Sequence, residues 1–313
     1  MTGTTAGVEV LTAGETMTAI RCDQLLRLGG RASVSIAGAE SNVAIAMARL
    51  GHRVTWSGRV GADESGELIL RTLAAEGVDT STVVRDDAAA TGLLIFEQRL
   101  PDVTRVEYHR AGSAGSRWRV ADVDAALALT PRLVHVTGVT AALSATTRDA
   151  LALLVRRARE GGAVVSLDVN FRSRLWSREE ATPVLRELAG YADIVIASPD
   201  ELELLGSDAR ALVAAGARDV VIKHGAEGAT AITEAGEESV AAHRVRVVDS
   251  IGAGDAFSAG YLSAVLDDAD VGERLRRGTA LGAFAVASAG DWEGLPTRDE
   301  LDLIGVGEGA AIR

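Results

Sequence analysis

The chain has 313 residues, of which 47% are hydrophobic, and a formal net charge of −12 at pH 7. This length can bury a large core in one domain, and the acidic balance argues against nucleic acid as the main partner. No apolar stretch reaches the roughly 18 residues that a membrane-spanning helix needs, so no membrane association is expected. The single cysteine, Cys22, excludes an internal disulfide. Together with an N-terminus that has neither a basic patch nor a long apolar run, it predicts a cytoplasmic protein.

Strand-like and helix-like segments alternate along most of the chain. The predicted strands are 8–13, 52–57, 133–136, 163–168, 193–197 and 219–223. The predicted helices are 41–50, 64–76, 144–160, 179–189 and 199–205. This alternation predicts a parallel sheet with helices on its faces, whose ligands lie beyond the carboxyl ends of the strands. We expect the positions that follow those ends to converge on one cleft: Gly138, Asp168, Ser198 and Lys223.

Two pairs of segments interrupt this alternation. Segments 16–22 and 32–37 form one pair, 91–99 and 104–110 the other, and all four have the composition of strands. Turn residues separate the members of each pair, Gly29-Gly30 in the first and Pro101-Asp102 in the second. We expect a small β-sheet lid, built from about 16–37 and 91–110 and inserted in a single domain spanning residues 1–313.

Residues 249–257 read Asp-Ser-Ile-Gly-Ala-Gly-Asp-Ala-Phe and carry the strongest functional signal. A strand-like run, 243–248, precedes them and an apolar, helix-like stretch follows, which predicts a strand-to-helix turn at the glycines. The first amides of a helix, here Gly252, Ala253 and Gly254, can stabilise negative charge, and Asp255 could accept the proton of a hydroxyl. The alternative is a glycine turn in which Asp255 only favours the helix N-terminus.

This segment resembles the C-terminal signature of the ribokinase-like, or PfkB, carbohydrate kinases, Asp-Thr-x-Gly-Ala-Gly-Asp, with Ser250 in place of Thr. Their N-terminal signature, Gly-Gly-x-x-x-Asn-x-Ala, is similar to residues 37–44, which keep Gly38 and Asn42 but have Ala37 as the first residue. The resemblance implies that Gly38 and Asn42 bind the substrate. The resemblance covers about residues 10–303. It implies an α/β fold, the ribokinase-like three-layer sandwich, in which helices flank a mostly parallel central sheet and a small β-sheet forms a lid.

The same resemblance implies phosphoryl transfer from ATP to a sugar, with Mg²⁺ as cofactor and Asp255 as base. Monovalent-cation activation is left open. In dimeric relatives the lid sheet is an interface, so a homodimer or higher homo-oligomer is expected. A lid also excludes water, which would otherwise compete with the sugar for ATP.

Two further segments resemble the family's nucleotide and metal motifs. Residues 220–228 are similar to a Val-Lys-x-Gly-x-x-Gly hairpin beside the nucleotide, which assigns Lys223, Gly225 and Gly228 to ATP; the alternative is a plain tight turn with an exposed lysine. The family's Asn-x-x-Glu motif orders metal-bound waters. Here it is similar to Ser198–Glu201, with serine for asparagine, so Glu201 is the metal candidate and Ser198 a metal or phosphate candidate. A helix N-cap explains both residues equally well.

The substrate prediction rests on segments 108–116 and 168–172, which are similar to segments of 2-keto-3-deoxygluconate kinases. The resemblance implies that Tyr108 and Arg110 reach the substrate from the lid and that Arg172 reaches it from the sheet. A guanidinium group offers paired donors that fit the carboxylate of a sugar acid. The alternatives are a solvated strand end for Arg110 and an ion pair with Asp168 for Arg172.

A late segment, 290–296, resembles the family's closing loop, in which Asp291 either reaches the substrate or caps a turn. Thr18 stands where ribose- and adenosine-type members usually have an Asp that binds sugar hydroxyls, which favours a sugar acid further. We therefore predict a kinase that phosphorylates 2-keto-3-deoxygluconate to its 6-phosphate. A fructokinase or other neutral-sugar kinase is the alternative within the family, and a non-catalytic sugar-sensing protein on the same fold is the alternative from another class.

Overall fold

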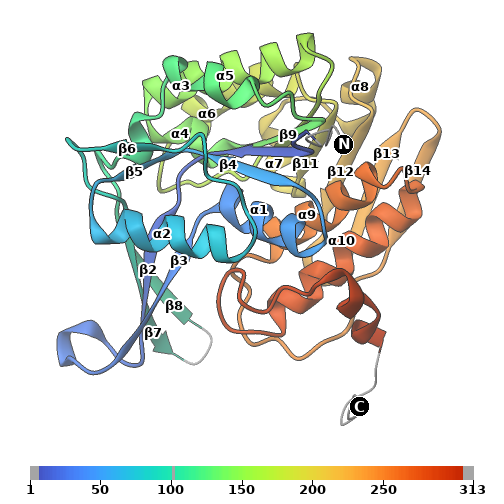
Figure 1. Ribbon diagram of the computed structural model, residues 1–313. Coiled ribbons are helices and arrows are strands. Elements are labelled where there is room, and N and C mark those ends of the chain that lie inside the picture. Colours follow the sequence, from blue (N-terminus) through green and yellow to red (C-terminus); the bar gives the residue numbers. More distant parts are fainter. Residues whose placement is uncertain (1–6, 101–102, 306–313) are drawn as a thin grey trace, which may run out of the picture.

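The computed structural model describes residues 7–100 and 103–305 (Figure 1). Its central sheet has eight strands in the order β14-β13-β12-β11-β10-β9-β1-β4. Neighbouring strands from β12 to β4 are parallel, whereas β13 and β14 add an antiparallel hairpin at one edge. The predicted mostly parallel sheet is confirmed. The strand bounds are β1 Val10–Ala13, β4 Val54–Ser57, β9 Leu133–Thr137, β10 Val164–Asp168, β11 Ile194–Ala197, β12 Asp219–Lys223, β13 Ala229–Thr233 and β14 Gly236–Val240.

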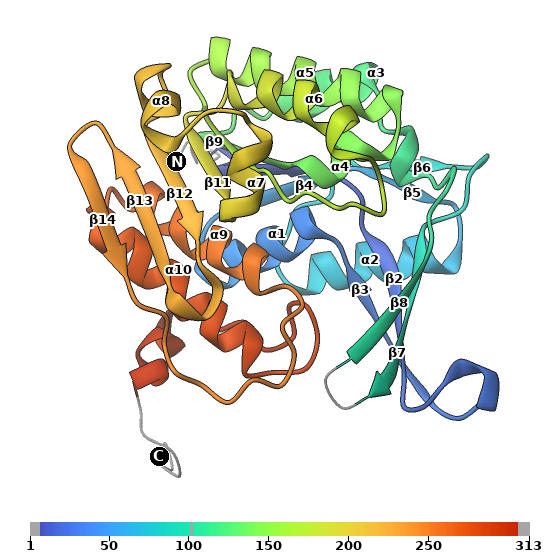
Figure 2. The same cartoon turned by 180° about the vertical axis from the view of Figure 1, so that it is seen from behind.

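Helices cover both faces of this sheet and give the predicted three layers (Figures 1 and 2). One face carries α1 (Ala39–Arg49), α2 (Glu64–Ala75), α9 (Ala253–Leu266) and α10 (Val271–Val286). The other carries α3 (Val120–Leu127), α4 (Gly138–Leu143), α5 (Ala145–Glu160), α6 (Arg178–Ala189), α7 (Pro199–Leu204) and α8 (Ala209–Ala214). Short 3-10 helices are η1 (Leu26–Leu28), η2 (Gly115–Arg117), η3 (Gly225–Glu227) and η4 (Arg298–Gly305).

The strand sequences explain why the sheet is covered on both sides. Successive side chains of a strand point to opposite faces. In β9, Leu133 belongs to the apolar core beneath α1 and α9, whereas Val134 and Val136 belong to the core beneath α5 and α6. Every residue of β9 is buried, as expected of a parallel strand between two helix layers.

A second, four-stranded sheet projects from one end of this sandwich (Figure 2). Its order is β3-β2-β7-β8, with bounds β2 Met17–Cys22, β3 Ala32–Ala37, β7 Leu93–Leu100 and β8 Val103–His109. We call it the small sheet. It matches the two predicted segment pairs, and its own apolar core contains Met17, Ala19, Ala37, Leu94 and Phe96. The predicted turn Pro101-Asp102 lies outside the described residues.

The structure corrects one predicted strand. Residues 243–248 form no strand, because after β14 the chain leaves the sheet, and the Val248 N–H donates a hydrogen bond of 2.7 Å to the Val286 carbonyl oxygen at the end of α10 and not to a strand. Two of their three valines are exposed, Val247 to 67% and Val248 to 54%. Sequence analysis also missed the two-stranded sheet of β5 (Arg59–Gly61) and β6 (Val84–Asp86). Among the described residues, no helix is long and apolar enough to cross a membrane.

Candidate active site

Polar side chains meet where the parallel strands end. Asp168 closes β10 and Lys223 closes β12, and they form an ion pair with 2.6 Å between Lys223 Nζ and Asp168 Oδ2. Ser258, on α9, donates a hydrogen bond of 2.8 Å to the same oxygen. Gly138, directly after β9, packs against Val169, since a Cβ atom on it would lie 2.2 Å from the Val169 carbonyl oxygen. The expected convergence of these strand ends is therefore observed.

Asp255 lies in the first turn of α9 and is buried beside this ion pair. Asn42 Nδ2 donates a hydrogen bond of 2.8 Å to Asp255 Oδ2, and Asn170 Nδ2 donates one of 3.3 Å to Oδ1. Asn42 comes from α1 and Asn170 from the loop after β10. Segments far apart in the sequence thus fix both carboxylate oxygens, and each oxygen retains a lone pair that can accept a proton.

The electrostatic surroundings of Asp255 make it more basic than an ordinary aspartate. Burial raises the pKa of Asp255 to about 6, and the negative charge of Asp168 acts in the same direction. The Asn42 hydrogen bond and the charges of Arg172 and Lys223 lower the pKa and limit this rise. A carboxylate with a pKa close to, but below, neutral pH is mostly ionised and suits general-base catalysis.

The N-terminus of α9 provides a place for negative charge beside this carboxylate. Gly252 is the N-cap residue, with φ +78°, and the first helical bond runs from Ala256 N–H to the Gly252 carbonyl oxygen at 2.9 Å. The N–H groups of residues 252–254 therefore have no partner within the helix. Lys223 Nζ lies 3.4 Å from the place of a Cβ atom on Gly254. Free amides, a helix N-terminus and an ammonium group together favour an anion here.

Comparison with known proteins places the whole chain in a family. The sequence fits the profile of the pfkB family carbohydrate kinases over residues 9–298. The chain belongs to this family. It is 38% identical over 309 residues to a 2-dehydro-3-deoxygluconokinase of Bacillus subtilis (strain 168), with 94% of each chain covered.

Solved structures of pfkB kinases agree with this assignment. A PfkB protein from Polaromonas sp. JS666 is 40% identical and superposes with a TM-score of 0.86, covering 94% of this chain and 99% of its own. A fructokinase from Xylella fastidiosa with bound ATP is 28% identical, with a TM-score of 0.82 and coverages of 95% and 97%. The resemblance to PfkB kinases and the ribokinase-like fold predicted from the sequence are both confirmed.

In this pfkB kinase the predicted nucleotide hairpin is present. The chain turns between β12 and β13 through η3, with Gly225 and Gly228 at φ +60° and +112°. Lys223 is not an exposed turn residue, because it is half-buried in its ion pair. Burial lowers the pKa of Lys223, but the nearby carboxylates of Asp168, Glu201 and Asp255 outweigh this effect and raise it, so the ammonium group stays charged.

The predicted metal motif forms a helix cap. The Ser198 Oγ accepts the Glu201 N–H at 3.3 Å, and Glu201 Oε2 accepts the Ser198 N–H at 2.8 Å, a capping box at the start of α7. Glu201 Oε1 accepts the Phe171 N–H at 2.8 Å. The N-cap interpretation therefore describes Ser198. Within the described ranges no cluster of three or more histidine, cysteine or acidic residues could hold a metal ion.

Arg110 is neither solvated nor free. Its Nε donates a hydrogen bond of 2.7 Å to Oε2 of Glu15, and its Nη2 forms an ion pair with the same oxygen. Glu15 is buried and also accepts a short hydrogen bond from Ser113. The alternative of a solvated strand end is therefore wrong. Glu15, just before the first strand of the small sheet, binds both Arg110 and Ser113, just after its last strand. Tyr108 is exposed on β8, with the Arg110 guanidinium carbon 5.8 Å from its ring centre.

Arg172 has a different environment. Its side chain is exposed and forms no hydrogen bond or ion pair with another described residue, yet its charge lowers the pKa of Asp255. The alternative of an Arg172–Asp168 pair is wrong, because Asp168 pairs with Lys223 instead. Arg172 is therefore a free cation close to the candidate base.

Asp291 and Gly38 also lie at this site. Among the described residues the Asp291 carboxylate caps no turn, and it forms an ion pair with Arg21 of β2. Burial raises the pKa of Asp291 to about 7, although the charge of Arg21 opposes this rise. Gly38 is the N-cap residue of α1, and a Cβ atom on it would lie 2.4 Å from the Glu15 carbonyl oxygen, so glycine is required where these segments meet.

Sequence analysis missed four residues of this region as site candidates. Asn170 lies in segment 168–172, and its backbone φ of +38° is a conformation that few non-glycine residues adopt and that asparagine adopts more readily than most. Glu40 is buried in the N-terminal signature, where Thr137 and Thr140 each donate a 2.6 Å hydrogen bond to its Oε1, and burial raises its pKa to about 7. Nothing in the local sequence signalled the partners of the other two, Glu15 and Arg21.

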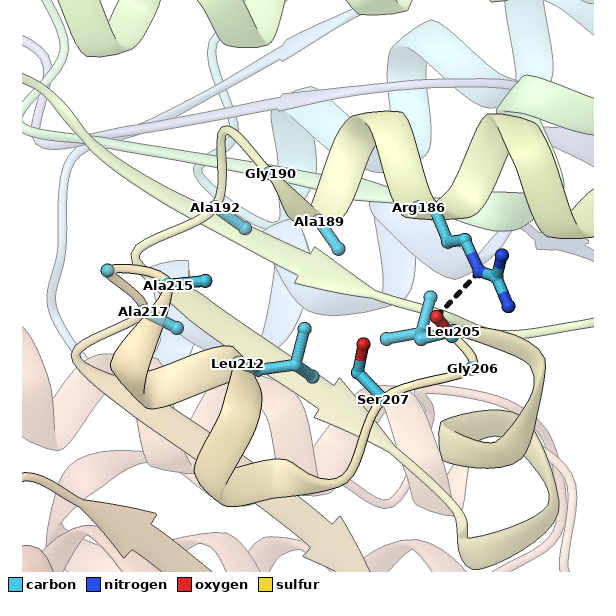
Figure 3. Close-up of a pocket in the computed structure, with 11 residues that line it drawn as sticks. Arg186, Ala189, Gly190, Ala192, Leu205, Gly206, Ser207, Leu212, Ala215 and Ala217 are labelled. Atoms are coloured by element: carbon cyan, nitrogen blue, oxygen red, sulfur yellow. Dashed lines mark hydrogen bonds between the residues drawn. The ribbon is translucent and has the colours of Figure 1, made fainter.

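A cavity of about 290 Å³ lies away from this chemistry (Figure 3). It is lined by residues that precede β11 and β12, such as Ala192 and Ala217, whereas the site lies at the opposite ends of these strands. Arg186 partly closes it by donating a 2.7 Å hydrogen bond to the Leu205 carbonyl oxygen. The cavity is thus not part of the candidate active site.

Proposed function

We propose that this kinase transfers the γ-phosphoryl group of ATP to the primary hydroxyl of a sugar acid, 2-keto-3-deoxygluconate, giving the 6-phosphate. One observation carries the proposal. The buried, hydrogen-bonded Asp255 lies beside the free amides of residues 252–254, with the unpaired guanidinium of Arg172 within electrostatic reach. A base, an anion site and a cation that can bind the carboxylate of the substrate thus lie at one end of the sheet.

In the proposed mechanism Asp255 accepts the proton of the sugar hydroxyl as its oxygen forms a bond to the γ-phosphorus. The bond between the γ-phosphorus and the bridging oxygen breaks, and ADP leaves with that electron pair. Amides of Gly252, Ala253 and Gly254 stabilise the charge on the transferred group. Asn42 and Asn170 hold the carboxylate of Asp255 in place, so little reorganisation is needed at the moment of transfer.

The nucleotide would bind along the hairpin of Lys223, Gly225 and Gly228. The ammonium of Lys223, between Asp168 and Gly254, suits the phosphates by charge. Mg²⁺ clusters the phosphates of ATP and offsets their charge. Each oxygen of Glu201 accepts one backbone N–H and keeps a lone pair, with which it would accept a hydrogen bond from a water molecule bound to Mg²⁺. Ser198 forms the helix cap together with Glu201.

The acid end of the sugar would meet Arg172, with Tyr108, Arg110, Asp291 and Gly38 around it. Arg110 already pairs with Glu15, so its positive charge is offset by that carboxylate. Only its remaining N–H donors can bind the substrate. Asp291 likewise contributes from its pair with Arg21. We therefore assign the main contact with the substrate carboxylate to Arg172. A neutral sugar bound at this position would leave the guanidinium of Arg172 without a counter-charge.

The small sheet would act as a lid inserted in one kinase domain. It also presents an exposed apolar surface, with Val34 58% and Leu100 59% exposed, that fits a second copy of the chain. We propose a homodimer, or a larger homo-oligomer, through this surface. The reaction would take place in the cytoplasm, where the thiol of Cys22 stays reduced.

The experiment that tests the function is an ADP-release assay with Mg·ATP and a panel of acceptors: 2-keto-3-deoxygluconate, 2-keto-3-deoxygalactonate, gluconate, fructose and ribose. We expect the highest kcat/KM with a 2-keto-3-deoxy acid. Preference for fructose or ribose would leave the kinase intact but reject the sugar acid and the role of Arg172. No ADP release with any acceptor would favour the non-catalytic alternative.

A further inference from the structure

Arg21 joins the small sheet to the loops of the candidate active site. It lies on β2, and its Nη1 is 3.1 Å from Oδ2 of Asp249, while its Nη2 pairs with Oδ1 of Asp291. These carboxylates lie 228 and 270 positions further along the chain. The guanidinium carbon also lies 4.0 Å from the ring centre of Phe96, on the neighbouring strand β7. The position of this cation is therefore fixed on one side by the small sheet and on the other by both loops.

Both partners of Arg21 contact the turn that leads into α9. Asp249 Oδ1 accepts the Ile251 N–H at 3.1 Å, so the carboxylate that binds Arg21 also shapes the turn. The Asp291 backbone packs on Gly252, where a Cβ atom would lie 2.3 Å from the Asp291 carbonyl oxygen. Ile251 itself packs against the apolar core of the small sheet. An ionic and an apolar contact thus connect the same turn to the same sheet.

The small sheet makes two more contacts with the Asp291 loop. Trp292 donates a hydrogen bond of 3.0 Å from Nε1 to the Ile36 carbonyl oxygen on β3. Ser35, also on β3, donates one of 2.6 Å to Glu293. The Arg21 pair with Asp249 differs from these two contacts. The Asp249 carboxylate that binds Arg21 also accepts a hydrogen bond from the Ile251 N–H, in the residue directly before Gly252.

We propose that Arg21 is a positioning residue that couples closure of the small sheet to the conformation of residues 249–255. This inference rests on the proposed function, since it assigns the amides of residues 252–254 to the transferred phosphoryl group. When the small sheet closes, the guanidinium enters between Asp249 and Asp291 and neutralises both. When the sheet moves away, these partly buried carboxylates lose their counter-charge, and the turn loses a support. The anion site is then complete only when the small sheet covers the sugar.

The test compares Arg21→Gln with Arg21→Lys and with a matched control, Arg105→Gln. Arg105 is also an arginine of the small sheet, but it is exposed, and its ion-pair partners among the described residues are Glu97 and Glu107 of that sheet. We expect Arg21→Gln to lower kcat at least about tenfold with less than about threefold change in the KM of Mg·ATP, since a misplaced anion site loses transition-state stabilisation. Arg21→Lys, which keeps one of two pairs, should be intermediate, and Arg105→Gln should match the wild type.

A second readout does not depend on turnover. Trp292 donates a hydrogen bond to β3, so its fluorescence should report whether the small sheet is closed. The chain has four tryptophans, so the contribution of Trp292 is taken as the difference between each protein and its Trp292→Phe counterpart. We expect addition of the sugar acid to change this fluorescence in the wild type and in Arg105→Gln, and to change it by less than half as much in Arg21→Gln. Each measurement uses the acceptor that the wild type phosphorylates best. If the substrate assignment is wrong, the wild type will prefer another acceptor. If the coupling is wrong, the ratio of variant to wild-type kcat will not fall.

Three results would overturn the coupling. One is a kcat in Arg21→Gln equal to that of Arg105→Gln. Another is a rise in the sugar KM at unchanged kcat, which would make Arg21 a substrate ligand. If Arg21→Gln does not fold, Asp249→Asn replaces it, because asparagine keeps the bond to the Ile251 N–H and loses only the ion pair. Unchanged kcat in Asp249→Asn would then also overturn the proposal.

Discussion

Asp255 has the two properties that a general base needs, a fixed orientation and a pKa below the working pH. Asn42 and Asn170 provide the orientation, and burial provides the raised basicity. Asp255→Asn preserves the shape of the side chain but replaces the ionisable carboxylate with an amide, which is too weak a base to accept the proton. We expect kcat to fall by about 10²- to 10⁴-fold with ATP affinity retained. Steady-state kinetics and ATP titration check this, and a near-normal kcat would exclude Asp255 as the base.

The pH dependence of the reaction follows from the same residue. Because the base acts in its ionised form, kcat/KM should fall as pH decreases below about 6, the pKa of Asp255 in the folded protein. Asn42 donates to the ionised form and lowers the pKa, so Asn42→Ala should raise it and shift the acidic limb to higher pH. A pH–rate profile of both proteins measures the shift. An unchanged or lowered limb in Asn42→Ala would contradict this assignment.

In the proposed function, substrate choice depends on Arg172. Arg172→Leu would remove a charge-assisted contact to the substrate carboxylate. Because the Arg172 side chain forms no hydrogen bond or ion pair with another described residue, the fold should be unaffected. We expect the KM for the sugar acid to rise about tenfold or more and the KM for ATP to stay the same. Arg156→Leu is the matched control, since Arg156 lies on α5, is also exposed and forms no side-chain hydrogen bond or ion pair with another described residue. Equal losses for both ligands would indicate a damaged site and not a lost carboxylate contact.

At the scale of elements, the turn before α9 depends on Gly252. This residue combines φ +78° with a backbone carbonyl 2.3 Å from the place of a Cβ atom. Gly77 has the same φ, +78°, but nothing within 4 Å of that place. Both Gly→Ala variants should lose about 1 kcal/mol of stability, because alanine disfavours this conformation. Gly252→Ala should lose more than Gly77→Ala, because its Cβ atom would overlap the Asp291 carbonyl oxygen. Only Gly252→Ala should also lower kcat, by about tenfold or more. Thermal unfolding measures the stability loss, and steady-state kinetics measure the loss of kcat. Equal losses of kcat in the two variants would refute this role of Gly252.

At the scale of the whole molecule, the exposed apolar surface of the small sheet predicts self-association. Val34 lies on β3 with 58% of its surface exposed. Val34→Asp would place a charge in the proposed interface, so we expect light scattering after gel filtration to show a dimer or larger assembly for the wild type and a smaller species for the variant. Val120→Asp, an equally apolar and 47% exposed position on α3, should leave the assembly unchanged. A monomeric wild type would reject the interface.

The local sequence contained most of the fold. Alternating apolar strands and amphipathic helices predicted the parallel sheet, and two helix-free segment pairs predicted the small sheet almost to the residue. The strand at 243–248 was wrong because a β-type composition makes no strand without a neighbour to pair with. Strand pairing is a tertiary property, and composition alone does not reveal it.

The site divides in the same way. The sequence by itself determined Asp255, the glycine turn and the basic residues, because their spacing at strand and helix ends follows from local backbone geometry. Only the tertiary structure decided which charges are paired: Arg110 with Glu15, Asp168 with Lys223, and Arg21 with Asp249 and Asp291, while Arg172 keeps no partner among the described residues. Ion pairs depend on distances of a few ångströms between segments up to 270 positions apart, and the packing of the sheet and its loops sets those distances.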